Sequence, residues 1–222
     1  MKKTVALCLL TLLVGAALGW GAGQLPDTVL SRSASPALMI TATASSEPVP
    51  ALDRSDNGPL LERGQEVLEA MKARDYASLA ALVHPEKGVR FTPYSTVDPG
   101  SDLEFTPERL AAAEEDSRTY TWGISDGKGA PLVYTIPDYF DLFVFNADYT
   151  TAPSIGMDTV LESGNALENA SDIYPEGRYV EYHFPGLAPE NEGFDWCSLK
   201  LVFEEWENDW YLTGAIHSQW TI

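Results

Sequence analysis

The sequence SLKLVFEEWENDWYLTGAIHSQWTI (Ser198–Ile222) indicates the fold class of this protein. Its two halves alternate in polarity and are rich in aromatic and β-branched residues, which is typical of β-strands. The intervening ENDW (Glu207–Trp210) has turn chemistry. A similar segment, GRYVEYHF (Gly177–Phe184), comes earlier, and residues 185–195, rich in Pro, Gly and acidic residues, separate it from the others. The C-terminal part therefore predicts a meander of long antiparallel strands.

Helical periodicity dominates the residues that come before these strands. Residues 59–85, PLLERGQEVLEAMKARDYASLAALVHP, carry apolar side chains at helical spacing and break at RDY, so they predict two helices, the first opened by Pro59. TPERLAAAEEDS (106–117) predicts a third helix capped by Thr106, and IPDYFDLFVFN (136–146) a short apolar fourth. Helices followed by a strand meander predict an α+β fold, with helices on one face of an antiparallel sheet.

The first 58 residues have a different composition. Lys2 and Lys3 precede an apolar run over residues 4–22, so residues 1–23 are either a signal peptide or an N-terminal membrane anchor. Residues 24–58 are rich in Ser, Thr, Ala and Pro, which predicts a flexible linker that ends in a turn at DRSDNG (53–58). Residues 59–222 then form a single domain. We expect it to be extracytoplasmic in a bacterium, either secreted or anchored to the outer face of the cytoplasmic membrane.

Charge and cysteine content exclude several classes of function. The chain carries 33 acidic residues against 14 Lys and Arg, a formal net charge of -19. Nucleic acid is not an expected partner, because phosphate binding needs clustered Lys and Arg. The domain holds one cysteine, Cys197, which cannot make an internal disulfide or a Cys-based zinc site and is predicted to be a small buried side chain.

Several long motifs resemble a known family. They are LAALVHPEKGVRFTPY (79–94), TYTWGISDGKGAP (119–131), YVEYHFPG (179–186), DWCSLKLVFEE (195–205) and WYLTGAIHSQWTI (210–222). Together they resemble uncharacterised exported bacterial proteins similar to the nuclear-transport-factor-2-like, cystatin-like superfamily, over residues 60–222. The resemblance implies a cone-like α+β domain with a curved sheet. It implies no single activity, because the superfamily includes dehydratases, isomerases, ligand binders and interaction modules.

Three polar residues of the predicted strands are candidates for chemistry. Glu181 and His183 share one face of the first strand, and His217 lies in the last strand. If these faces line the concave side of the sheet, a carboxylate and two imidazoles converge and can transfer protons. Alternatively, the polar face is solvated, or the histidines are buried for structural reasons. The three side chains lack the close spacing of a metal site, so we predict no metal and no cofactor.

Other ligand-binding candidates lie in the two motifs at residues 79–94 and 119–131. Arg90 is one of few bases, and it either receives an anionic ligand or pairs with neighbouring acids. Tyr94 and Trp122 either form an aromatic rim at the mouth of the cone or belong to the core. The glycines of the second motif do not follow the phosphate-loop order, and no G-x-S-x-G motif is present in the sequence.

These observations predict a binding or interaction module of the cell envelope that lacks a catalytic signature. Its partner is a small molecule or an envelope protein, and it contacts the membrane only through its N-terminal segment. Two alternatives stay open: a lyase- or isomerase-like acid–base enzyme with a Glu/His pocket, and a structural component of an envelope assembly.

Overall fold

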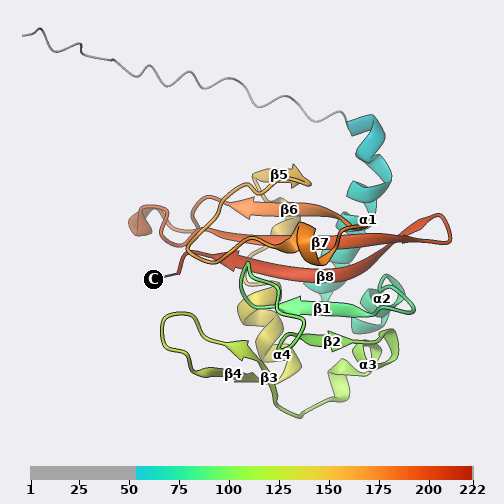
Figure 1. The fold of residues 1–222 in the computed structure, drawn as a ribbon, viewed down its shortest axis with the longest axis horizontal. Coiled ribbons are helices and arrows are strands. Elements are labelled where there is room, and N and C mark those ends of the chain that lie inside the picture. Colours follow the sequence, from blue (N-terminus) through green and yellow to red (C-terminus); the bar gives the residue numbers. More distant parts are fainter. Residues whose placement is uncertain (1–53, 222) are drawn as a thin grey trace, which may run out of the picture. The chain divides into compact units, whose positions relative to one another are not determined.

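The computed structural model describes residues 54–221. The predicted leader and the linker up to residue 53 lie outside the described residues. The described part is an α+β domain built on a curved sheet, as the sequence predicts (Figure 1).

Six strands form the main sheet in the order β2-β1-β8-β7-β6-β5. Their bounds are β1 Val89–Thr92, β2 Leu103–Phe105, β5 Ser154–Met157, β6 Arg178–Phe184, β7 Cys197–Trp206 and β8 Asp209–Gln219. The three long strands β6, β7 and β8 form the predicted antiparallel meander. The prediction of a purely antiparallel sheet is wrong at one place, because β1 pairs with β8 in parallel.

One long helix and several short ones accompany the sheet. The helices are α1 Arg54–Ala73, α2 Tyr76–Ala81, α3 Pro107–Ala111, α4 Ile136–Tyr139 and α5 Ala170–Ile173, with a π-helix, η2, at Phe140–Val144. Short 3-10 turns are η1 Ala113–Glu115, η3 Tyr149–Thr151 and η4 Pro189–Asn191. Helix α1 begins at Arg54 rather than at Pro59, so the turn predicted for residues 53–58 is helical from residue 54 onward.

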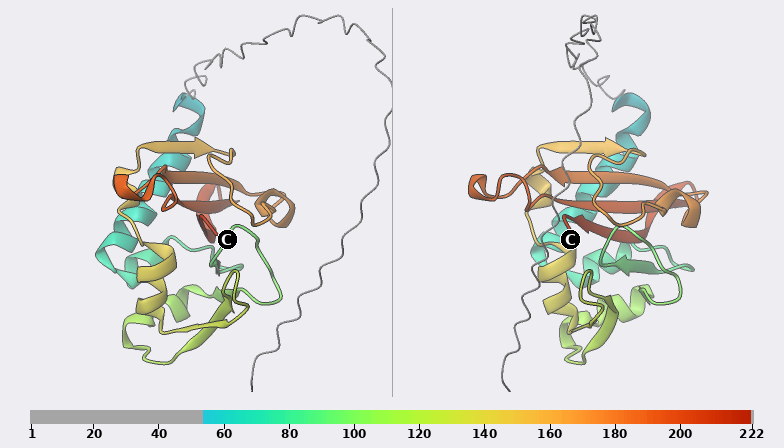
Figure 2. Two further views of the ribbon diagram at one scale, coloured as in Figure 1. Left: turned by 90° about the vertical axis from the view of Figure 1, so that its left-hand side faces the viewer. Right: turned by 60° about the vertical axis from the view of Figure 1, so that its left-hand side comes forward.

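The remaining strands form a separate hairpin. Strand β3 (Tyr120–Ile124) pairs with β4 (Pro131–Tyr134), and the glycine-rich residues 125–130 connect them. The hairpin passes directly into α4 and η2, which cover the same side of the sheet as α1 (Figure 2).

Strand β7 is buried on both sides, and its alternation defines two faces of the sheet. Cys197, Leu199, Leu201 and Phe203 belong to the main hydrophobic core with α1, and we call this side the helix face. Val202 belongs to a smaller core on the opposite side, together with Val97, Ala170, Tyr179 and Ile216, and we call this side the second face. Because successive side chains of a strand point to opposite sides, Ser198 and Lys200 also lie on the second face.

Aromatic rings fill the helix face. The ring of Trp122 stacks on Tyr139 with centroids 3.8 Å apart and on Phe105 at 5.5 Å. Phe143 continues the stack beyond Tyr139 at 5.1 Å. The indole nitrogen of Trp122 donates to the carbonyl oxygen of Tyr134 at 3.0 Å, so its one polar atom has a partner.

Residues 158–177, which we call the cover segment, pack on the second face. Tyr174 lies against Gly214 of β8, where an added Cβ would come within 2.8 Å of the Tyr174 hydroxyl. The side chain of Asn169 pairs with both backbone polar groups of Val97, accepting from its N–H at 2.8 Å and donating to its carbonyl at 2.9 Å. The cover segment is thereby joined to the loop that follows β1.

Two details of the last strand differ from the prediction. An irregularity between Val202 and Phe203 shifts the pairing near Thr213, so Leu212 joins Ala215 in the main core although simple alternation placed them on opposite faces. Continued alternation would place Trp220 on one face of the sheet, but it lies beyond the end of β8 and is 41% exposed, with its ring 5.4 Å from that of Phe194. Ile222 lies outside the described residues.

A close contact between α1 and β6 can be tested by a double mutant. A Cβ added at Gly64 would fall well inside van der Waals contact with the Tyr182 hydroxyl. We expect Gly64→Ala to lower the free energy of unfolding by about 1–3 kcal/mol because of this overpacking. The matched control is Gly58→Ala in the same helix, where an added Cβ meets nothing within 4 Å. In a Tyr182→Phe background, Gly64→Ala should lower the free energy of unfolding much less. An equal loss in both backgrounds, measured by urea unfolding, would contradict the contact.

Candidate functional site

A pocket of about 370 Å³, which we call the loop pocket, lies where the loop after β1 meets the β3–β4 hairpin and the cover segment. It is lined by Pro93, Tyr94, Thr96, Asp98, Ser101, Asp102, Gly123, Ile124, Ser125, Asp126 and Ala166. Both glycine-containing motifs singled out in the sequence therefore contribute to one pocket.

The loop after β1 is held in shape by its own aspartates. Asp98 accepts from Gly100 N–H at 2.9 Å and from the Ser101 hydroxyl at 2.8 Å. Asp102 accepts from the Thr92 hydroxyl at 2.7 Å and from Asp98 N–H at 2.9 Å. Hydrogen bonds to the charged form lower the pKa of Asp98, whereas burial raises the pKa of Asp102. The loop is therefore ordered by internal hydrogen bonds and presents carboxylates to the pocket.

The predicted aromatic rim is half present. Tyr94 lines the loop pocket and packs edge-on against Phe143, with centroids 5.9 Å apart, and burial raises the pKa of its hydroxyl. Trp122 is fully buried in the aromatic stack of the helix face, so of the two alternatives left open for it the core position is the one found. Between them, Gly123 has a φ of 133°, and an added Cβ would meet Pro93 at 3.2 Å. A glycine here lets the hairpin approach the loop closely.

His217 lies on the helix face, directly behind the loop pocket. Its Nδ1 is 3.1 Å from the carbonyl oxygen of Pro93, and its ring packs edge-on against Phe143 at 5.7 Å. A carbonyl only accepts, so Nδ1 carries the hydrogen and donates it. Burial lowers the pKa of His217 to about 4, and the ring is therefore neutral at pH 7. His217 fixes the backbone of the pocket loop without lining the pocket.

Glu181 and His183 lie on the second face, under the cover segment, and both are buried. His183 Nδ1 is 2.9 Å from the Ser198 hydroxyl, and the ring lies 6.0 Å from that of Trp196. Burial lowers the pKa of His183. Glu181 Oε2 accepts from Leu161 N–H in the cover segment at 3.3 Å.

The predicted convergence of Glu181, His183 and His217 is wrong. Across β7, His183 pairs with Ser198 and His217 pairs with Leu199. These two β7 residues are consecutive, so the two histidines point to opposite faces of the sheet. A single substrate cannot reach both imidazoles, and the three-residue acid–base arrangement does not form.

A lysine is buried in the middle of strand β7. Lys200 is 0% exposed, and its Nζ lies 2.8 Å from Glu168 Oε2, 3.3 Å from Ser218 Oγ and 3.6 Å from Glu181 Oε2. The Ser218 hydroxyl continues to Ser95 Oγ at 2.9 Å. We call these five residues the Lys200 cluster. The burial of Lys200 could have been suspected from the sequence, because this lysine stands between apolar residues in SLKLVF.

Arg90 does not offer a free cationic group. Its guanidinium forms an ion pair with Glu104 at 2.6 Å and lies 3.4 Å from the carbonyl oxygens of Pro99 and Asp102. Of the two alternatives left open by the sequence, Arg90 therefore pairs with a neighbouring acid and does not receive an anionic ligand.

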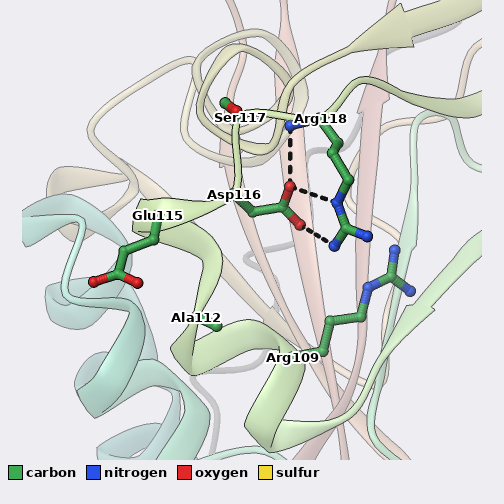
Figure 3. Close-up of a pocket in the computed structure, with 6 residues that line it drawn as sticks. All are labelled: Arg109, Ala112, Glu115, Asp116, Ser117 and Arg118. Atoms are coloured by element: carbon green, nitrogen blue, oxygen red, sulfur yellow. Dashed lines mark hydrogen bonds and ion pairs between the residues drawn. The ribbon is translucent and has the colours of Figure 1, made fainter.

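A further hollow of about 440 Å³ lies beside α3 (Figure 3). Arg118 forms two hydrogen bonds with the Asp116 carboxylate, at 2.6 and 2.9 Å, which lower the pKa of that carboxyl group. The guanidinium of Arg109 lies over the Phe105 ring at 3.8 Å. Both cations are already engaged with groups of the protein, so this hollow is a weaker candidate than the loop pocket.

Neither a metal-ligand cluster nor a membrane-spanning helix is found in residues 54–221. No group of three or more His, Cys, Asp or Glu side chains in this range is arranged to hold a metal ion. No helix in the described part of the chain is long and apolar enough to span a membrane.

No protein-family model and no curated protein matches the sequence. Solved structures do resemble the fold. An NTF-2-like protein of unknown function from Shewanella oneidensis is 12% identical, with 73% of this chain and 98% of that chain covered and a TM-score of 0.33. The CamKII hub homology domain of Chlamydomonas reinhardtii is 14% identical, with 74% and 98% covered and a TM-score of 0.36.

A domain of unknown function with a cystatin-like fold from Nostoc punctiforme is 10% identical, with 74% of this chain and 76% of that chain covered and a TM-score of 0.34. The Shewanella and Nostoc proteins carry the names of the superfamily that the sequence resembles. At such identities and TM-scores the likeness concerns the fold alone.

The buried neutral His217 predicts a loss of stability in acid. Its pKa falls from 6.5 to about 4 on folding, so its contribution is fully present above pH 6.5 and is lost as the pH falls towards 4. The shift corresponds to about 3 kcal/mol. His217→Asn keeps a donor near Pro93 but does not titrate, and its urea-unfolding free energy should fall less than that of the wild type over this range. If the free energies of unfolding of the two proteins fall equally with pH, the acid sensitivity does not come from His217.

Proposed function

We propose that the protein is an exported binding module of the cell envelope and that its ligand occupies the loop pocket. The leader-like N-terminal sequence supports export. The observation that carries the binding proposal is a pocket of about 370 Å³ with an ordered loop, an aromatic side chain and several convergent polar groups. This volume lies within the range of small-molecule sites.

The charge of the lining limits the chemistry of the ligand. Asp98, Asp102 and Asp126 all line the loop pocket, and hydroxyl groups make up much of the rest. Carboxylates accept hydrogen bonds and attract positive charge, whereas they repel anions. The pocket therefore suits a neutral polyhydroxylated molecule or a small cationic one, with Tyr94 as the surface on which a sugar ring or an ammonium group packs.

Ligand screening by thermal shift and calorimetry tests this proposal. Neutral sugars and small amines should raise the melting temperature, and carboxylic acids should not. For any ligand found, Tyr94→Ala and Asp126→Asn should each weaken binding by about tenfold, the size of one lost contact of this kind. Glu190→Gln, an exposed acid in η4, serves as the matched control. The proposal fails if binding survives both pocket variants, or if only anions bind.

One observation favours the alternative of a structural envelope component. Phe194 and Trp220 are 60% and 41% exposed and pack edge-on at one end of the sheet, and Leu187 in the same β6–β7 connection is 49% exposed. Aromatic residues are enriched at protein interfaces, and exposed apolar patches mark interaction sites. This apolar patch supports contact with an envelope protein.

Substitution of the apolar patch separates the two candidates. Phe194→Ser with Trp220→Ser should abolish cross-linking of the full chain to envelope proteins in intact cells while ligand binding in the loop pocket stays unchanged. Leu142→Ser provides the control, since Leu142 is 46% exposed but lies in η2. Cross-links that persist in the double variant would remove the support for an assembly role.

A further inference from the structure

Lys200 lies at the centre of a chain of hydrogen bonds that reaches two walls of the loop pocket. Its ammonium group donates to Glu168 Oε2 in the cover segment at 2.8 Å and to Ser218 Oγ in β8 at 3.3 Å. Lys200 itself is 0% exposed and is not one of the residues that line the loop pocket. Its two partners lead in two directions from one buried charge.

The first direction leads to the wall formed by the cover segment. Glu168 forms an ion pair with Lys200, and Ala166, two residues earlier in the chain, lines the loop pocket. A bond that fixes Glu168 to the sheet therefore fixes the backbone beside this wall as well. The cover segment is thus anchored to β7 close to the point where it meets the pocket.

The second direction leads to the wall formed by the loop after β1. Ser218 Oγ accepts from Lys200 and lies 2.9 Å from Ser95 Oγ, and both serines are buried. Tyr94 and Thr96, on either side of Ser95, line the loop pocket. Ser95 therefore points into the protein between two pocket residues, and its inward contact leads back to Lys200.

The two walls also contact each other directly. The Thr96 hydroxyl donates to the Leu167 carbonyl oxygen at 2.8 Å. The Asn169 side chain accepts from Val97 N–H at 2.8 Å and donates to the Val97 carbonyl oxygen at 2.9 Å. Leu167 and Asn169 are the chain neighbours of Glu168, so these bonds and the ion pair of Lys200 belong to one closed arrangement.

A lysine suits this position because of its geometry and not because of its contribution to stability. A buried ion pair contributes little net stability compared with hydrophobic side chains of similar volume, because its charges must be desolvated. An ammonium group carries three donors on one atom, so it can hold the cover segment and β8 together. Glu181 Oε2, 3.6 Å away in β6, adds electrostatic attraction.

We propose that Lys200 is a positioning residue of the loop pocket and that it couples the cover segment to the loop after β1. The part that concerns ligand binding rests on the proposed function, whereas the coupling of the two walls stands on the contacts of Lys200. Removal of its ammonium group should release both walls together. A ligand that holds both walls should in turn order the cover segment, because such coupling is reciprocal.

Amide hydrogen exchange of the full chain tests the coupling without any ligand. Lys200→Met should speed exchange by about tenfold in both residues 94–98 and residues 166–169, because each segment loses an anchor and opens locally at a lower free energy. Lys72→Met is the matched control, since it removes an ion pair of the same length, 2.8 Å, to Asp148. It should leave both segments unchanged. Faster exchange confined to residues 166–169 would overturn the proposal.

A double-mutant cycle separates positioning from a general loss of stability. Ser95→Ala should speed exchange in residues 166–169, to which Ser95 is linked through Ser218 and Lys200. In a Lys200→Met background it should have no further effect, because the path is already broken. Additive effects would contradict the coupling. If Lys200→Met does not fold, Glu168→Gln should speed exchange in residues 94–98, and unchanged exchange there refutes the proposal.

Calorimetry with glucose and choline, a neutral polyol and an ammonium probe, tests the link to binding. Lys200→Met should weaken by about tenfold whichever probe binds the wild type, although Lys200 does not line the pocket. Equal affinities of the two proteins would overturn the positioning role and leave the proposed function intact. If neither probe binds while both walls respond together in hydrogen exchange, the coupling stands and the proposed function loses its support.

Discussion

The burial of strand β7 on both faces is the constraint on which the rest of this structure depends. Leu199 and Lys200 are neighbours in the chain, yet one packs in the main hydrophobic core and the other in a polar cluster on the opposite side. Burying both faces requires a second layer, which the cover segment supplies. Polar groups enclosed by that layer need partners, because an unpaired buried group costs free energy. The Lys200 cluster, the cover segment and the separation of His183 from His217 all follow from the burial of β7 on both faces.

The sequence was informative wherever local chemistry decides the structure. Thr106 caps α3 with its side chain accepting from Arg109 N–H, and Pro107 follows in the first turn, as the TPERL motif predicts. Alternation places Tyr179, Glu181 and His183 on one face of β6, and the structure confirms it. Cys197 is buried in the core, as expected of a lone cysteine. Each of these features depends on neighbours a few residues away.

Features that depend on pairing between distant segments could not be predicted. Alternation shows which residues of one strand share a face, but the register across β7 decides whether residues of β6 and β8 share one. The irregularity near Thr213 then exchanges the faces of part of β8. The burial of Lys200 likewise depends on Glu168 in a remote loop. The parallel pairing of β1 with β8 is set by chain topology, which no local pattern records.

The joint between Asn169 and Val97 has a consequence for how this fold can vary. The amide side chain of Asn169 offers one donor and one acceptor to the backbone of Val97, as a neighbouring strand would. Such a pair of side-chain hydrogen bonds does not require the neighbouring residues of the two segments to pair in a fixed register. Substitutions in the cover segment that leave Asn169 in place should therefore leave the loop after β1 in its position. The two loops are thus joined by side chains, Asn169 to Val97 and the Thr96 hydroxyl to the Leu167 carbonyl at 2.8 Å, and not by a ladder of backbone hydrogen bonds.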